Sequence, residues 1–257
     1  MKLSVVIPAY NEEGSITETL LTLYDALTAA GIDHEIVVTN DNSKDNTLAI
    51  LEGLAPRIPT LTYYTNKGPN GFGYAVRYGL ERYQGDCVAV MMADLSDDPA
   101  DLIAYYRKLH EGEGYDAVFG SRWIKGGKVI DYPGPKKFIN RIANAIVKTL
   151  FNLKYNDCTN AFKLYRRETM DGIKPFLSPH FNLTLELPLK TIVRGYSYAV
   201  VPNSWTNRKY GESKLKIKEM GSRYFFIMMY CLIEKYFSRG DFRKRPVVAP
   251  PAPVAVS

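Results

Sequence analysis

Acidic and hydroxyl side chains directly follow an apolar segment near the middle of the chain. The segment Cys87–Met92 is rich in Val and Met, and Asp94, Ser96 and Asp97 come just after it. In an open α/β sheet, ligands collect at the carboxyl ends of the strands. A carboxylate at that place can bind a hard divalent cation that also contacts a diphosphate. The pattern therefore predicts a metal or phosphate role for Asp94, whereas Asp98–Pro99 is typical of the start of a helix.

Polar turns follow four of the expected strands and carry most of the other candidate side chains. Because the carboxyl ends of parallel strands meet at one edge of a sheet, these turns are expected to build a single pocket. Asp41 is suited to accept a hydrogen bond from a nucleobase or a ribose, and the amides before the first helix are suited to face phosphates. The alternative is that the same side chains only shape strand-to-helix turns. The turns are 8-PAYNEEGS-15, 40-NDNSKDNT-47, 66-NKGPNGFG-73 and 93-ADLSDD-98.

Strand-like and helical segments alternate through the first half of the chain, which predicts a mostly parallel sheet. Beyond Ser121 the pattern is less regular, with helices expected near Phe138–Phe151 and Leu183–Val193. The glycine turn does not match GxGxxG, so a dinucleotide-binding fingerprint is not supported. The expected strands are Leu3–Ile7, Glu35–Thr39, Leu61–Tyr64, Cys87–Met92 and Ala117–Phe119.

The four turns together resemble the successive motifs of family 2 glycosyltransferases with the GT-A fold. The similarity is carried by VVIPAYNEEGSI, NDNSKDNT, NGFGYAVRYGL and VMMADLSDDP, and it continues in FGSRW, NRIAN and RKYGESK. The chain is most similar to the dolichyl-phosphate mannose synthase-like branch. That branch moves a sugar from a nucleotide donor onto a polyprenyl phosphate. The resemblance covers about residues 3 to 237 and keeps the order of the family's motifs.

The resemblance implies an α/β fold of the GT-A type, with a mostly parallel nucleotide-binding sheet flanked by helices. We expect this domain over residues 1–213, basic amphipathic membrane-interface helices over 214–240 and a disordered tail over 241–257. The implied reaction is transfer of a hexose from a GDP- or UDP-sugar to a polyprenyl or dolichyl phosphate, with inversion. The residues implied to bind the donor are Pro8, Ala9, Tyr10, Glu12, Asn40, Asp41 and Ser213.

The remaining implied roles concern the metal, the acceptor and catalysis. Asp94, with Ser96, would bind Mg²⁺ or Mn²⁺ on the donor diphosphate, and Arg122 and Arg141 would hold the phosphate of the acceptor lipid. A phosphate monoester is already anionic, so the reaction needs no dedicated general base. We therefore interpret the three histidines, His34, His110 and His180, as surface or turn residues. The group expected to act in catalysis is Asp94, Arg208 and Lys214.

Two positions depart from the family pattern. Where the family often has Asp-Ala-Asp, this chain has Met92-Ala93-Asp94, and where a paired Asp-Asp is usual it has Asn40-Asp41. A thioether is a soft ligand and does not suit a hard cation. Asp94 would then carry the metal, with Ser96, Asp97 or water completing the coordination shell. Mg²⁺ tolerates such a site because it often takes only one or two carboxylates and keeps several waters.

Charge is concentrated near the end of the chain. The net charge is +6, and residues 208–245 contain 11 Lys or Arg against 4 Asp or Glu. These charges flank the apolar segment Tyr224–Ile233, which as a helix spans roughly 15 Å, about half of a bilayer core. A basic helix of this kind predicts peripheral binding at a membrane surface. The alternative is a helix that packs on the catalytic domain or in a homo-oligomer contact.

Composition and cysteine usage restrict the remaining classes of function. The three scattered cysteines, Cys87, Cys158 and Cys231, form no CxxC pair and suggest reduced thiols in the cytosol. We expect a cytoplasmic protein at the cytoplasmic face of a membrane, and no motif supports a nucleic-acid partner. Two other functions stay open, namely a transferase acting on a soluble or glycan acceptor and a non-catalytic nucleotide-sugar-binding protein.

Overall fold

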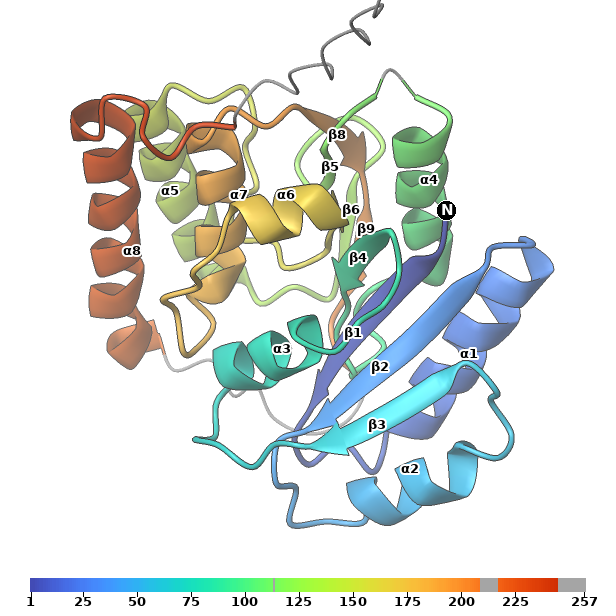
Figure 1. Ribbon diagram of the computed structural model, residues 1–257. Coiled ribbons are helices and arrows are strands. Elements are labelled where there is room, and N and C mark those ends of the chain that lie inside the picture. The colour runs from blue at the N-terminus through green and yellow to red at the C-terminus, as the bar shows by residue number, and fades with distance from the viewer. Residues whose placement is uncertain (113, 209–216, 245–257) are drawn as a thin grey trace, which may run out of the picture.

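The computed structural model describes residues 1–112, 114–208 and 217–244. Its centre is a seven-stranded sheet, and two further short strands, β6 (Lys128–Ile130) and β9 (Ser204–Thr206), pair with each other beside it (Figure 1). The strands of the large sheet are β1 (Leu3–Ala9), β2 (His34–Asn40), β3 (Leu61–Thr65), β4 (Cys87–Val90), β5 (Ala117–Ser121), β7 (Lys163–Arg166) and β8 (Tyr198–Pro202).

The order of strands brings the carboxyl ends of the early strands together. The order is β3-β2-β1-β4-β7-β5-β8, and every pairing is parallel except those of β7, which runs antiparallel between β4 and β5. The five strands expected from the sequence are all present. β4 ends at Val90 rather than at Met92, because the backbone N–H of Met92 donates to the Asp97 carboxylate instead of to a neighbouring strand.

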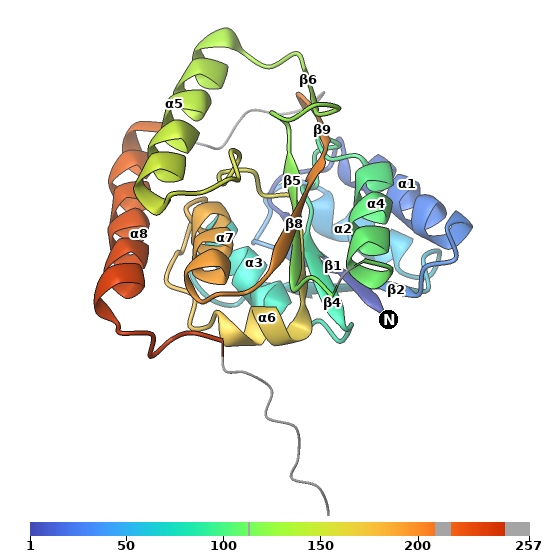
Figure 2. The same ribbon diagram turned by 90° about the horizontal axis from the view of Figure 1, so that it is seen from above.

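Helices cover both faces of the sheet, as a buried parallel sheet requires. One apolar core lies under α1 (Ile16–Ala29), α2 (Thr47–Leu54) and α4 (Pro99–His110). As expected, Asp98 caps α4, accepting a hydrogen bond from the Ala100 N–H at 2.8 Å. The second core lies under α3 (Phe72–Leu80), α6 (Arg167–Gly172) and α7 (Leu183–Val193). Outside α7 lie α5 (Gly134–Phe151) and α8 (Ile217–Phe237), as Figure 2 shows.

The apolar C-terminal helix α8 belongs to the second core. Ile227 and Cys231 are fully buried there, and the buried side chains of Arg194 and Glu234 form an ion pair at 2.7 Å that joins α7 to α8. Packing on the domain, one of the two alternatives for this segment, thus accounts for one face of α8. No helix in the described part of the chain combines the length and the apolarity needed to cross a bilayer.

The segment after α8 returns to the body of the protein. Lys244 donates its backbone N–H to the Arg194 carbonyl at 2.7 Å and forms an ion pair with Asp116 at 2.7 Å. Residues 241–244, which the sequence assigned to the disordered tail, therefore contact the domain. The remainder of the predicted tail, residues 245–257, lies outside the described residues.

The Arg194–Glu234 pair gives a test of how α8 is attached. In Glu234→Ala the buried guanidinium of Arg194 loses its carboxylate, so we expect the free energy of unfolding to fall by about 3–5 kcal/mol, measured by urea denaturation. The control is Lys174→Ala, which breaks the exposed Lys174–Asp171 pair and should change stability by less than about 1 kcal/mol. Equal stabilities of the two variants would contradict this role of the pair.

Candidate active site

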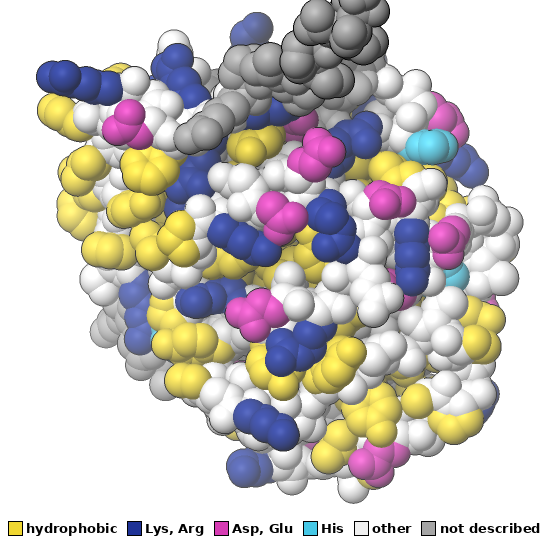
Figure 3. Space-filling view, in the orientation of Figure 1, with side chains coloured by type: hydrophobic (Ala, Val, Ile, Leu, Met, Phe, Trp, Pro, Cys, Tyr) yellow, Lys and Arg dark blue, Asp and Glu magenta, His cyan; other side chains and the backbone are white. Residues whose placement is uncertain are grey.

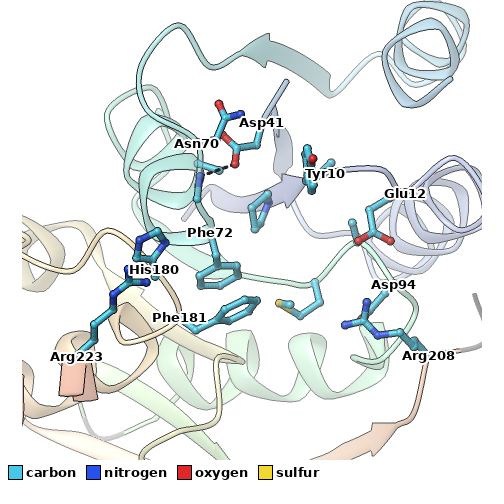
Figure 4. Close-up of a pocket in the computed structure, with 16 residues that line it drawn as sticks. Tyr10, Glu12, Asp41, Asn70, Phe72, Asp94, His180, Phe181, Arg208 and Arg223 are labelled. Carbon is cyan, nitrogen blue, oxygen red and sulfur yellow. Dashed lines mark hydrogen bonds and ion pairs between the residues drawn. The ribbon is translucent and has the colours of Figure 1, made fainter. Parts of the chain in front are cut away.

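A pocket of about 400 Å³ opens at the carboxyl edge of β1, β2 and β4 (Figure 4). The turn after β1 contributes Tyr10 and Glu12, the turn after β2 contributes Asp41, and the turn after β4 contributes Asp94. The glycine turn after β3 adds residues 70–72. All four polar turns that the sequence singled out therefore line one pocket, as the parallel sheet predicts.

At one end of the pocket, Asp41 is held by the glycine turn. Its carboxylate accepts a hydrogen bond from the Asn66 side-chain amide at 2.8 Å and another from the Gly71 N–H at 2.7 Å. The buried Asn66 also bonds the Pro69 carbonyl and the Gly68 N–H, both at 2.9 Å, so one side chain shapes the turn and orients Asp41. Asn66 was not a predicted site residue, although the turn that contains it was.

The glycines of this turn allow another segment to approach. A Cβ atom on Gly73 would lie 2.5 Å from backbone atoms of Ser178 and Pro179, and Gly71 has a φ of +148° beside the same segment. Because only glycine leaves this space, the backbone at 178–180 packs directly on the first turn of α3. Phe181 then stacks on Phe72, with ring centroids 4.3 Å apart.

A buried carboxylate on α7 fixes the same segment from behind. Glu186 accepts the N–H groups of Leu177 at 2.8 Å and Ser178 at 2.7 Å, and it pairs with Lys190 at 2.6 Å. The Glu186–Lys190 pair lies under the surface, since neither of the two side chains is exposed. The result is that His180, which is partly exposed in a bend as predicted, reaches the pocket wall. His34 is buried in β2, where its ring contacts the Ile32 carbonyl, so the prediction that it is a surface or turn residue is wrong.

At the other end of the pocket, Asp94 forms an ion pair with Arg208. The distance between Asp94 Oδ2 and Arg208 Nη2 is 2.9 Å, and Asp94 Oδ1 accepts the Ser96 N–H at 3.2 Å. Arg208 is brought there by β9, because the Thr206 N–H donates to the Ser96 carbonyl at 3.0 Å. In Figure 4, His180 and Arg223 lie across Phe72 and Phe181 from this pair.

Ser96 and Asp97 do not join Asp94 at the pocket. Both side chains are buried and neither lines the cavity. Asp97 turns inward to accept the Met92 N–H at 3.0 Å, and burial raises the pKa of its carboxyl to about 7. Neither side chain therefore lies with Asp94 on the pocket wall, and their part in a metal shell stays a prediction. Across the described residues, no group of three or more His, Cys, Asp or Glu side chains converges on a metal position.

The predicted donor residues divide into three groups. Pro8, Ala9, Tyr10, Glu12 and Asp41 line the pocket. Asn40 does not; it is buried and accepts the Ser43 N–H at 3.1 Å, which shapes the turn after β2. Ser213 and Lys214 lie outside the described residues. The pocket residues that sequence reasoning missed are Asn70, Phe72, His180, Phe181 and Arg223.

The two arginines expected to hold the acceptor phosphate meet at Trp123. The guanidinium groups of Arg122 and Arg141 lie 5.6 Å and 5.1 Å from the centre of the indole, and the Lys137 amine lies 5.6 Å from it. Arg122 is buried and bonds Asp157 through two nitrogens, at 2.7 Å and 2.9 Å. The buried indole N–H has no hydrogen-bond partner within the described part of the chain.

An apolar groove of about 330 Å³ runs between α5 and α8, and Asn140, Ile146 and Met228 are among its lining residues. It adjoins the pocket at consecutive residues of α8: Arg223 lines the pocket and Tyr224 lines the groove. The Tyr224 hydroxyl donates to the Phe181 carbonyl at 3.1 Å, which ties the two walls together.

The outer faces of α5 and α8 expose many large apolar side chains. Figure 3 shows such side chains gathered over α8. α5 carries four Lys or Arg and no acidic residue, a composition typical of interfacial helices. The sequence prediction placed the membrane interface on 214–240 and did not consider the exposed apolar side chains of α5. The exposed residues are Phe138, Ile139, Ile142, Ile146 and Leu150 on α5, and Phe225, Phe226, Met229, Ile233, Tyr236 and Phe237 on α8.

Comparison with known proteins indicates the same family as the sequence motifs do. Residues 4–173 match the model of the family described as Glycosyl transferase family 2. The chain is 32% identical over 224 residues to the dolichol-phosphate mannosyltransferase of Pyrococcus furiosus, covering 85% of this chain and 60% of that protein. It therefore spans less than two thirds of the length of that relative. It is 29% identical over 221 residues to the undecaprenyl-phosphate mannosyltransferase of Micrococcus luteus, covering 84% of this chain and 88% of that protein.

Solved structures share the fold. Glucosyl-3-phosphoglycerate synthase of Mycobacterium tuberculosis, crystallised with Mn²⁺, UDP and phosphoglyceric acid, has a TM-score of 0.66 at 21% identity and covers 91% of this chain and 78% of its own. The same enzyme with Mg²⁺ and UDP has a TM-score of 0.63 at 19% identity, with coverages of 91% and 79%. The predicted α/β fold of the GT-A type is confirmed. The family model covers more than half of the sequence, and the chain belongs to glycosyl transferase family 2.

Proposed function

We propose that this protein transfers a hexose from a nucleotide-sugar donor to a polyprenyl phosphate at a membrane surface. The observation that carries the proposal is the junction on α8, where the polar pocket and the apolar groove meet at Arg223 and Tyr224. A charged nucleotide and a long apolar chain need two such compartments side by side. The names of the Pyrococcus and Micrococcus relatives support a polyprenyl phosphate as acceptor.

The donor would lie along the pocket from Asp41 to Asp94. The carboxylate of Asp41 still has acceptor capacity beyond its two bonds, so it suits N–H or O–H groups of a nucleoside. Arg208 and Arg223 would face the diphosphate, because guanidinium groups match phosphate oxygens in geometry and charge. Lys214 and Ser213 keep their proposed roles near the donor phosphates.

A divalent cation, Mg²⁺ or Mn²⁺, fits this pocket only together with the donor. Met92 offers no hard ligand and Asp97 faces the core, so Asp94 is the carboxylate of its loop that lines the pocket. Mg²⁺ commonly combines one carboxylate with substrate phosphates and water. The lining contains three acids, Glu12, Asp41 and Asp94, against two arginines, so a diphosphate gains from added positive charge. A bound cation would offset charge on the leaving nucleoside diphosphate.

The acceptor phosphate would lie beside Trp123. Arg141 and Lys137 supply positive charge there, and the indole N–H supplies a hydrogen-bond donor that has no other partner among the described residues. Asp157 would keep Arg122 in place rather than leave it mobile. The phosphate is already a nucleophile at neutral pH, so these residues need to align it with the anomeric carbon rather than deprotonate it. Displacement in line would invert the configuration.

The membrane would bind the outer faces of α5 and α8. Their apolar side chains are exposed on the side of the groove, and the basic residues of α5 suit an anionic lipid surface. The acceptor chain would pass from the bilayer into the groove, so that its phosphate meets the pocket without leaving the interface. These faces support peripheral binding at a membrane surface, which we propose to be the cytoplasmic one.

The first test is sugar transfer to a short polyprenyl phosphate, with GDP-mannose, UDP-glucose, UDP-galactose and UDP-N-acetylglucosamine as donors. We expect one donor to give a glycolipid in the presence of Mg²⁺ or Mn²⁺. Asp94→Asn should lower the rate at least about a hundredfold, since it removes a charge aimed at the diphosphate. The matched control is Asp98→Asn in the same loop, which is exposed and keeps a capping side chain.

The outcomes separate the alternatives. If sugar is transferred only to soluble acceptors, the acceptor is not a polyprenyl phosphate, and the protein is a transferase for a soluble or glycan acceptor. Donor binding without turnover on any acceptor would indicate a non-catalytic protein. Wild-type rates in Asp94→Asn would contradict the role given to that carboxylate.

A second prediction concerns Asn66 as a positioning residue for the donor. Asn66→Ala removes the amide that orients Asp41 and leaves the Gly68 N–H without its acceptor. We expect the affinity for GDP or UDP, measured by calorimetry, to fall about tenfold, with the circular dichroism spectrum unchanged. Asn46→Ala is the control, because that exposed amide bonds Glu13 away from the pocket. Unchanged affinity in Asn66→Ala would show that Asp41 needs no such support.

A third prediction concerns docking by α5. Phe138→Glu places a charge in the apolar face of the helix, and we expect cosedimentation with phosphatidylglycerol vesicles to weaken about tenfold. Thr62→Glu on β3 adds the same charge to an exposed position of the edge strand and should leave vesicle binding unchanged. Equal binding by both variants would exclude α5 from the membrane contact.

A further inference from the structure

Arg208 occupies Asp94, the carboxylate that we propose for the cation. Its Nη2 lies 2.9 Å from Asp94 Oδ2, and the other oxygen of Asp94 is engaged by the Ser96 N–H at 3.2 Å. Asp94 is buried and Arg208 is only 19% exposed, so water screens this pair weakly. Arg208 and a divalent cation therefore need the same oxygen of Asp94.

The surrounding chain makes this competition hard to avoid. Arg208 is two residues from Thr206, whose N–H donates to the Ser96 carbonyl, and Trp205 forms a bridge with Asp97. The Asn207 N–H also donates to the Ile130 carbonyl at 3.0 Å. The backbone that carries Arg208 is thus attached to the loop that carries Asp94. A rotation of the Arg208 side chain can exchange its partner without moving that backbone.

Among the described residues, the loop that carries Asp94 offers no second carboxylate to a cation while Arg208 stays in place. Met92 stands where the family often has an aspartate, and Asp97 is bonded to the Met92 N–H inside the core. A cation bound to Asp94 alone would lie next to the guanidinium, and the two like charges would repel. A diphosphate removes this conflict because it gives Arg208 a second anionic partner close by.

We infer that Arg208 exchanges partners as the donor binds, which makes cation binding depend on the nucleotide. Without a nucleotide, Arg208 neutralises Asp94 and keeps cation affinity low. With a nucleoside diphosphate in the pocket, Arg208 transfers to the phosphate oxygens and releases Asp94 Oδ2. The two ligands are then positively coupled, and Arg208 carries the coupling. This inference rests on the proposed donor site but not on the proposed lipid acceptor.

The test measures Mn²⁺ binding by the paramagnetic resonance of free Mn²⁺, with no acceptor present. Without nucleotide, we expect the wild type to bind Mn²⁺ weakly. Saturating GDP or UDP should tighten Mn²⁺ binding in the wild type and in Asp94→Asn, where only the Mn²⁺–nucleotide complex contributes. The increase in affinity should be at least about tenfold larger in the wild type. In Arg208→Gln, Mn²⁺ should bind about tenfold more tightly than in the wild type without nucleotide, because a neighbouring positive charge is gone. In Arg208→Gln, the nucleotide should therefore increase Mn²⁺ affinity by a smaller factor than it does in the wild type.

Arg223→Gln is the matched control, since it removes the other arginine of the pocket, which lies across the aromatic pair from Asp94 (Figure 4). It should weaken nucleotide binding and change Mn²⁺ affinity without nucleotide less than about threefold. Equal Mn²⁺ affinities of Arg208→Gln and the wild type without nucleotide would overturn the inference. If Arg208→Gln does not fold, the wild type still provides a test. An equal Mn²⁺ affinity of the wild type with and without GDP or UDP would also overturn the inference. These Mn²⁺ measurements contain no acceptor, so they do not depend on whether the protein glycosylates a lipid. The proposed acceptor and the exchange at Arg208 can therefore be disproved independently.

Discussion

The arrangement of the site depends on three ion pairs buried in the second half of the chain. Taking a charge out of water costs several kcal/mol unless a partner meets it in good geometry. Arg122–Asp157, Lys190–Glu186 and Arg194–Glu234 are all almost fully buried, so each excludes packings in which its partners are apart. The first pair fixes Arg122 beside Trp123, the second fixes the segment that carries His180 and Phe181, and the third attaches α8. The walls of both compartments are set by these pairs.

The two halves of the fold contribute in different ways. The first half is a regular alternation of strands and helices, and its turns supply the floor of the pocket through backbone hydrogen bonds and short polar side chains. The second half inserts β7 antiparallel to its neighbours, and its helices return over the sheet to close the pocket from the side of α3. The contact between the backbone at 178–180 and the first turn of α3 is where the halves meet, and Gly73 makes it sterically feasible.

This division explains which features could be predicted from the sequence. Asp41 and Asp94 were found because a parallel sheet brings its carboxyl ends together whatever the side chains are. His180, Phe181 and Arg223 were missed because their place depends on long-range packing that leaves no local pattern. Asp97 shows a different limit: the sequence put it beside Asp94, but a single backbone hydrogen bond decides that it faces the core. The exposed apolar side chains of α5 were missed because Lys, Arg and Asn interrupt them in the sequence, whereas those of α8 form a continuous apolar segment.

Charge balance connects one departure from the family pattern, Met92, to the rest of the pocket. A second aspartate in place of Met92 would add a fourth acid to a lining that has only two arginines, and Arg208 could then neutralise one carboxylate while the other kept a cation. With Met92, the Asp94–Arg208 pair is neutral by itself. In the proposed site, a cation that binds Asp94 would therefore depend on negative charge supplied by another group. A nucleoside diphosphate would supply that charge, so with Met92 at this position the proposed site would depend more on its donor than one with a second aspartate.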